Sequence, residues 1–214
     1  MNWFVDILWK GILIGVVVSA PLGPVGVLCI QRTLNKGRWY GFVTGLGAAL
    51  SDIAYALLTG YGMSFIFDYI SKNIFYLQLF GSVMLLAFGF YTFRSNPVQS
   101  IRPVSSNKGT YLHNFVTAFF VTLSNPLIIF LFIGLFARFG FLAPSVRLFE
   151  QISGYFFIVL GALIWWFGIT FFVNKVRAKF NLRGIWMINR VIGIVVMVVS
   201  IVGLLYTLSG ESLY

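Results

Sequence analysis

The chain has 214 residues, of which 59% are hydrophobic and 9% are charged, and its formal net charge is +10. A soluble domain carries about 25% charged residues, so this composition excludes a globular protein with a wet surface. Apolar runs of about 18 residues or more recur, and each is long enough to cross a hydrocarbon layer of roughly 30 Å. We therefore predict an all-α integral membrane protein.

Reactive side chains are few, which limits the chemistry available to the chain. Cys29 is the single cysteine, so there is neither an intrachain disulfide nor a zinc-binding cysteine pattern. His113, the single histidine, stands at the entrance to a predicted span, where an interfacial role is expected. Without a convergent cluster of reactive groups, we predict no enzyme activity, no metal site and no cofactor. The basic residues fall in short loops, so nucleic acid is not an expected partner.

Six membrane spans are predicted in chain order. They cover Ile7–Gln31, Tyr40–Met63, Phe75–Phe93, Asn114–Ala137, Ile152–Val173 and Met187–Leu208. Most of the 15 basic residues fall on one side, in the loops after the first, third and fifth spans. Cytoplasmic loops carry such an excess of Lys and Arg, so both termini are predicted to be extracytoplasmic.

The first and fourth spans are interrupted near their middles. Residues 20–26 (Ala-Pro-Leu-Gly-Pro-Val-Gly) break the first span, and residues 122–126 (Thr-Leu-Ser-Asn-Pro) break the fourth. Proline removes a backbone donor and clashes with the preceding turn. In a membrane the freed backbone groups must find internal partners or line a cavity. Two broken spans in corresponding halves of a chain indicate a transporter's binding site.

The two halves also match in order. Pro24 aligns with Pro126 at an offset of 102, residues 46–48 (Leu-Gly-Ala) align with residues 160–162 at 114, and Gly81 aligns with Gly193 at 112. Because each half holds three spans, the second half would insert upside down relative to the first. We predict one three-helix repeat at 1–95, a linker at 96–109 and an inverted repeat at 110–214.

Asp52 is the only acidic residue deep within a predicted span. A carboxylate near the bilayer centre costs at least roughly 2.5–3.5 kcal/mol, unless it faces a polar cavity, pairs with a cation or is protonated. Burial favours the neutral acid, and an incoming cation favours the charged form. That competition would give proton antiport. The alternative is a structural acid that accepts hydrogen bonds from freed amides of a neighbouring helix.

The two breaks would place helix N-termini, with free N–H groups, inside the protein. Such amides would hold a substrate carboxylate while Asp52 holds the amine; the alternative is a pair of ordinary proline kinks. Asn125 would either contact substrate or satisfy the break in its own helix. The candidate substrate-binding residues are Pro21, Gly23, Pro24, Gly26, Asp52, Asn125 and Pro126, and Asp52 is the candidate proton-coupling residue.

Several other residues carry weaker hypotheses. The second-rank site candidates are Ser51, Tyr55, Thr122 and Ser124, which are expected to make helix contacts. Arg138 and Arg190 are expected to reach the membrane interface, with a counter-ion role for Asp52 as the alternative. The pair Trp165-Trp166 is expected to pack or to face lipid. The motifs Gly11-x-x-x-Gly15 and Gly41-x-x-x-Gly45 suit close helix packing, either within the chain or in a homodimer.

These motifs resemble the lysine exporter (LysE/RhtB-type) family. The resemblance rests on residues 21–24 (Pro-Leu-Gly-Pro), residues 45–52 from Gly45 to Asp52, residues 124–126 (Ser-Asn-Pro), residues 161–166 and Gly193. It implies a small exporter of amino acids or related cations in the bacterial inner membrane, driven by a proton or cation gradient. Leu127 stands where many members of the family have a lysine, so a relative's substrate should not be transferred.

We therefore expect a secondary transporter that exports amino acids or related small amino compounds by proton antiport. Its expected partners are a small-molecule substrate and the lipid bilayer. One alternative is an exporter of a metal or inorganic cation with the same fold, although a single buried acid offers too few ligands for a metal. The other alternative is a membrane accessory protein that transports nothing.

Overall fold

The computed structural model describes residues 3–21, 23–65, 74–95, 109–125, 127–141, 148–176 and 182–209. Regular structure in these ranges is entirely α-helical, which confirms the all-α part of the predicted fold class. The linker predicted at 96–109 lies, apart from Gly109, outside the described residues. The described helices are α1 (Trp3–Ser19), α2 (Pro24–Lys36), α3 (Arg38–Phe65), α5 (Ile74–Arg94), α6 (Tyr111–Leu123), α7 (Leu127–Phe139), α8 (Leu148–Lys175) and α9 (Leu182–Leu208).

The lengths and composition of these helices suit a membrane protein. The stretches 38–62 in α3, 148–175 in α8 and 186–208 in α9 are each long and apolar enough to cross a membrane. Two further candidates appear when the pairs α1–α2 and α6–α7 are each counted as one broken span. The described residues therefore hold three to five candidate spans. The predicted span 75–93 coincides with α5, which has 21 residues.

Both predicted interruptions are present. α1 ends at Ser19 and α2 begins at Pro24, with a bend of 80° between them. α6 ends at Leu123 and α7 begins at Leu127, with a bend of 70°. Pro24 is the first residue of α2, a position that suits proline because its missing N–H would have no acceptor within the helix. Pro126 lies outside the described residues.

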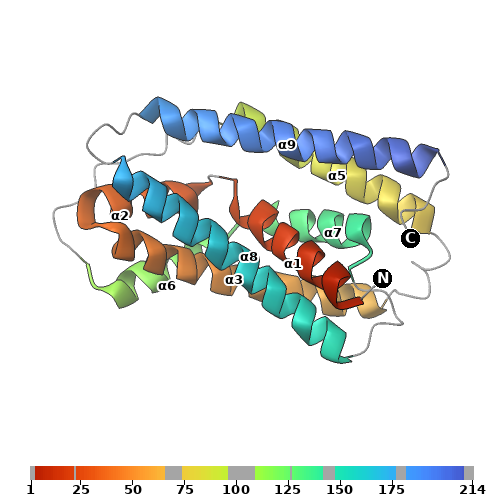
Figure 1. Cartoon of the computed structure of the whole chain (residues 1–214), viewed down its shortest axis with the longest axis horizontal. Helices are drawn as coiled ribbons and strands as arrows, with labels where there is room; N and C mark the ends of the chain where they lie inside the picture. Colours follow the sequence, from red (N-terminus) through yellow and green to blue (C-terminus); the bar gives the residue numbers. More distant parts are fainter. Residues whose placement is uncertain are drawn as a thin grey trace.

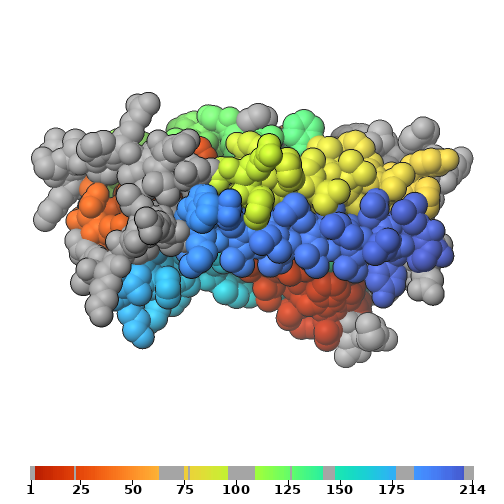
Figure 2. Space-filling view, turned by 90° about the horizontal axis from the view of Figure 1, so that it is seen from above, coloured from red at the N-terminus to blue at the C-terminus, as the bar shows by residue number. Residues whose placement is uncertain are grey.

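The helices form two layers (Figure 1). α5 and α9 lie side by side along one face, and Figure 2 shows α9 running beside α5 on that face. Beneath them α1 packs on α8, α6 packs on α3, and α3 packs on α8. α7 contacts both α5 and α3, and so connects the two layers. Phe132, Leu135 and Phe136 of α7 lie in the apolar core, and each is at most 1% exposed.

Basic residues gather at one end of the molecule. This end holds the C-termini of α2, α5 and α8 and the N-termini of α3, α6 and α9 (Figure 1). Side-chain contacts agree, because Tyr40 of α3 stacks on Tyr111 of α6 with 4.3 Å between the ring centroids. We call it the basic end after its described residues, which are Lys36, Arg38, Arg94, Lys175 and Arg190.

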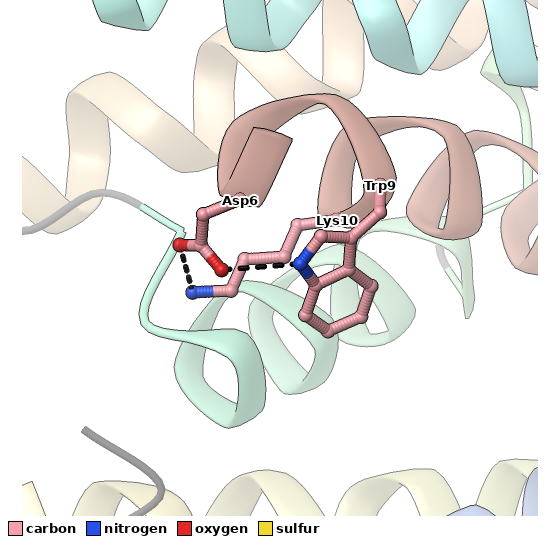
Figure 3. Close-up of polar contacts among 3 residues, drawn as sticks. All are labelled: Asp6, Trp9 and Lys10. Atoms are coloured by element: carbon pink, nitrogen blue, oxygen red, sulfur yellow. Dashed lines mark hydrogen bonds and ion pairs between the residues drawn. The ribbon is translucent and has the colours of Figure 1, made fainter. Parts of the chain in front are cut away.

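One cation of α1 sits toward the opposite end and is neutralised locally. The Lys10 side chain is buried, and its Nζ lies 2.6 Å from Oδ2 of Asp6, one turn earlier. The indole Nε1 of Trp9 donates a 3.1 Å hydrogen bond to the other oxygen of Asp6 (Figure 3). Asp6 thus serves as a partner for Lys10 and contributes nothing to the cavity described below.

The two glycine motifs bring helices together within the chain. A Cβ added at Gly15 would lie 2.0 Å from the carbonyl oxygen of Ile158, so α1 and α8 touch backbone to backbone. At Gly45 an added Cβ would lie 2.5 Å from the Trp166 ring. The packing alternative for these motifs is therefore observed, and the faces proposed for a homodimer are already occupied.

Candidate functional site

A cavity of about 380 Å³ lies where the two broken spans approach each other. Six of the seven predicted substrate-binding residues line it, and these are Pro21, Gly23, Pro24, Gly26, Asp52 and Asn125. The seventh, Pro126, lies outside the described residues. The structure thus brings together residues from α1, α2, α3 and the α6–α7 break, although their roles in binding stay predictions.

Asp52 sits in the middle of α3 and is 4% exposed. The Ser19 hydroxyl at the end of α1 donates a 3.1 Å hydrogen bond to Oδ2 of Asp52. Within the described part of the chain, Ser19 is the hydrogen-bonding partner of this carboxyl group, which has no ion pair there. The acid is therefore held by a hydroxyl group, whereas the structural alternative expected backbone amides.

The counter-ion alternative is not observed for either arginine. Arg138 is 6% exposed and donates a 3.3 Å hydrogen bond to Thr207 of α9. α9 covers Arg138, and Gly203 gives its guanidinium room to lie there. The position of Arg138 at the membrane interface stays a prediction. Arg190 is exposed and lies over the Trp186 ring, 3.8 Å from its centroid.

The start of α2 presents amide groups to the cavity wall. Gly23 is the N-cap and offers no side-chain acceptor, and the first intrahelical bond runs from the Val27 N–H to the Gly23 carbonyl at 3.1 Å. The first amides of a helix have no acceptor within it and form the positive end of its dipole. Because Val25 and Gly26 line the cavity, an anionic group would be stabilised at this position.

The start of α7 differs, because Asn125 caps it. Asn125 Oδ1 accepts a 3.2 Å hydrogen bond from the Leu127 N–H, and its backbone carbonyl accepts one of 3.3 Å from the Ile128 N–H. Of the two roles considered for Asn125, satisfying the break in its own helix is the one observed for its side-chain oxygen. The two breaks are therefore not equivalent as anion sites.

The second-rank candidates divide into two pairs. Thr122 and Ser124 line the cavity; the Thr122 hydroxyl is buried and has no hydrogen-bond partner among the described residues. Ser124 donates to the Phe120 carbonyl at 2.7 Å. Ser51 and Tyr55 instead donate to the backbone carbonyls of Phe119 and Leu123, and so join α3 to α6. Helix contact is thus confirmed for Ser51 and Tyr55.

Other cavity residues were not among the predicted site residues. Asn189 of α9 is 1% exposed, and its Nδ2 donates to the carbonyls of Thr92 (2.9 Å) and Ser95 (3.3 Å). A lone asparagine in an apolar span was a signal that could have found it. Trp166 packs within the core, as predicted, but it also borders the cavity.

The position of Arg32 could not be read from the sequence. Arg32 directly follows the first predicted span, where a loop cation is expected, yet it is only 7% exposed. One guanidinium nitrogen donates to Thr44 Oγ1 (3.0 Å) and to the Asn114 carbonyl (2.8 Å), and the other donates to Thr117 Oγ1 (2.8 Å). These bonds fasten α2 to both α3 and α6. Arg32 therefore fixes the helix whose N-terminus reaches the cavity.

The cavity extends from the breaks toward the basic end. Tyr91 and Thr92 belong to the last turn of α5, Ser95 directly follows that helix, and Asn189 belongs to the early part of α9; all four line the cavity. A cavity that is bounded by two broken spans and holds one buried acid, in an apolar helical chain, is the arrangement expected of a membrane translocator.

Comparison with known proteins agrees with this class. The family model "LysE type translocator" matches residues 16–207, and the chain belongs to this family of transporters. It is 30% identical over 172 residues to the "Putative amino acid efflux protein YcgF" of Bacillus subtilis, covering 78% of this chain and 79% of that protein. It is 28% identical over 140 residues to the "Uncharacterized membrane protein YahN" of Escherichia coli, covering 64% and 60%. No solved structure matches.

Proposed function

We propose that this protein exports amino acids or related small amino compounds across the bacterial inner membrane in exchange for protons. The observation that carries the proposal is the buried carboxyl group of Asp52 in the wall of a cavity between two broken spans. The relative from Bacillus subtilis, whose printed name refers to amino acid efflux, supports the substrate class.

The cavity offers complementary groups for the two charges of an amino acid. Asp52 supplies a negative charge for the amine, and the start of α2 supplies amides and a helix dipole for the α-carboxylate. Half-helix N-termini facing anionic substrate groups are a recurring feature of secondary transporters. In the proposed binding mode the substrate bridges α3 and α2.

Competition at Asp52 would couple the two fluxes. With the cavity open to the outside, the substrate leaves and Asp52 takes up a proton. With the cavity open to the cytoplasm, the amine of a new substrate displaces that proton. Because one carboxyl group holds either the proton or the amine, each export event returns one proton.

We further propose six spans arranged as two inverted repeats, with both termini extracytoplasmic. In this arrangement α1, α2 and α3 correspond to α6, α7 and α8. The contacts between helices support it: α1 packs on α8 and α6 packs on α3, while α2 contacts α8 and α7 contacts α3. The proposed equivalents α3 and α8 both have 28 residues, and α2 and α7 both have 13. The gathering of cations at one end supports a cytoplasmic position for that end.

Transport by the purified full-length protein in proteoliposomes tests the proposal. Liposomes preloaded with a mixture of labelled amino acids should release some of them faster when an inward proton gradient is imposed, and a protonophore should remove the acceleration. Liposomes without protein are the control. Release of divalent cations in place of any amino acid would contradict the proposal, as would amino acid release that does not respond to the gradient.

A further inference from the structure

We infer that the exported compound is a neutral amino acid with an apolar side chain. This inference rests on the proposed function and adds the class of the substrate's side chain. It is drawn from the charges, polar groups and apolar surfaces that line the cavity.

The charges around the cavity suffice for one amine and no more. Asp52 is the only acidic residue among the described residues that line it, and no lysine, arginine or histidine lines it in the described part of the chain. A basic side chain would bring a second ammonium group, and Asp52 would already be used by the α-amine. An acidic side chain would bring a second carboxylate with no cation to meet it. Burying either charge without a partner is strongly unfavourable.

Several polar side chains beside the cavity are already engaged within the protein. Asn189 donates to the carbonyls of α5, Ser124 donates to its own helix, and the Asn125 side-chain oxygen caps α7. What remains includes Asp52 and the start of α2, which match the amine and carboxylate that every amino acid shares, and the buried Thr122 hydroxyl, which has no hydrogen-bond partner among the described residues. Apart from Asp52, the remaining polar side chains of the described lining are uncharged, so none of them can neutralise a second charge on the substrate.

The rest of the lining is apolar. Val18, Phe88, Ile128 and Leu131 lie on the walls, together with the Trp166 ring. Transfer of an apolar side chain from water to such walls is favourable, and a cavity of this size falls within the range that holds small ligands. Aromatic rings also attract cations, but one cation–π contact recovers less than the desolvation of an ammonium group costs.

Counterflow in proteoliposomes tests the inference. Vesicles preloaded with unlabelled leucine, methionine, lysine or glutamate would each be exposed to labelled forms of the same four amino acids. We expect leucine and methionine to exchange at least about 10-fold faster than lysine or glutamate. Faster exchange of lysine or glutamate would overturn the inference and leave the proposed function standing. Exchange of no amino acid would contradict both, and divalent-cation release would then point to the other substrate class.

A second carboxylate introduced at Ile128 gives an independent test. Ile128 is the second residue of α7 and lines the cavity. Ile128→Asp would supply a carboxylate to pair with a basic substrate side chain. Ile128→Asn has nearly the same shape without the charge and is the matched control. Both variants remove the same apolar wall, and only Ile128→Asp adds a charge, so the ratio of lysine to leucine exchange should be at least about 10-fold higher in the Asp variant than in the Asn variant. An equal rise in both variants would overturn the charge argument.

Discussion

The hydroxyl group of Ser19 donates a 3.1 Å hydrogen bond to the carboxyl group of Asp52, which joins the last residue of α1 to the middle of α3. Both side chains are buried, at 3% and 4% exposure. The point at which the first broken span ends is therefore the point at which the buried acid is held. A shift of α1 relative to α3 would change the surroundings of this acid directly, which suits a residue that exchanges ligands during transport.

Replacement of Ser19 should weaken substrate binding. Ser19→Ala removes a hydrogen bond to the carboxyl group that is proposed to hold the amine, and hydrogen bonds to charged groups contribute about 1.5–3 kcal/mol. We expect KM in counterflow to rise about 10-fold or more, with a smaller change in the maximal rate. Ser19→Thr keeps the hydroxyl group and should restore KM. A wild-type KM for Ser19→Ala would show that Ser19 does not position Asp52.

The Thr122 hydroxyl should matter for transport more than for stability. It is buried without a partner among the described residues, so Thr122→Val removes no observed hydrogen bond. We expect an unchanged or raised melting temperature in detergent, together with weaker substrate binding. Ser51→Ala is the comparison, because Ser51 donates to the Phe119 carbonyl at 2.6 Å and its loss should cost about 1 kcal/mol. Equal destabilisation of the two variants would contradict this difference.

Arg32 should contribute to stability through its geometry as well as its charge. Arg32→Lys keeps the charge but cannot reproduce the fork that reaches Thr44, Thr117 and the Asn114 carbonyl. Unfolding in detergent should become easier by about 1–3 kcal/mol. Arg38→Lys is the control, since Arg38 lies over the rings of Trp39 and Phe167 and should change stability less. An equal loss of stability in both variants would argue against a stabilising role for the hydrogen bonds of Arg32.

Gly15 should not tolerate a side chain. In Gly15→Ala the added Cβ would meet the Ile158 carbonyl oxygen at 2.0 Å, so α1 and α8 must separate, at a cost of about 1–3 kcal/mol. Gly168→Ala places a Cβ in open space on α8 and should be neutral or stabilising by about 0.5–1 kcal/mol. Thermal unfolding of both variants in the same detergent measures the difference. A stable Gly15→Ala variant would mean that the α1–α8 contact is looser than described.

Local signals made the breaks and the buried acid predictable. Proline and glycine act on their own turn of helix, so the ends of α1 and α6 fall where the residue types place them. Asp52 stands out because a charged residue is rare in an apolar span. Both signals need no knowledge of which helices become neighbours.

The rest of the site depends on tertiary packing, which a single sequence does not specify. Nothing local indicates that Ser19 faces Asp52, or that Asn189 from the last span joins the same cavity. Arg32 and Arg138 resemble ordinary span-end cations in sequence, yet neighbouring helices cover both. Ser51 and Tyr55 are close to Asp52 in sequence but turn toward α6.

Proton flux driven by substrate is the most direct test of the coupling role proposed for Asp52. A pH-sensitive dye inside proteoliposomes would record proton movement when an exchangeable amino acid is added, for the wild type, Asp52→Asn and Glu150→Gln. Glu150 lies in the first turn of α8, away from the cavity, and serves as the control acid. We expect substrate-dependent proton flux for the wild type and Glu150→Gln and none for Asp52→Asn. Undiminished flux through Asp52→Asn would contradict this expectation.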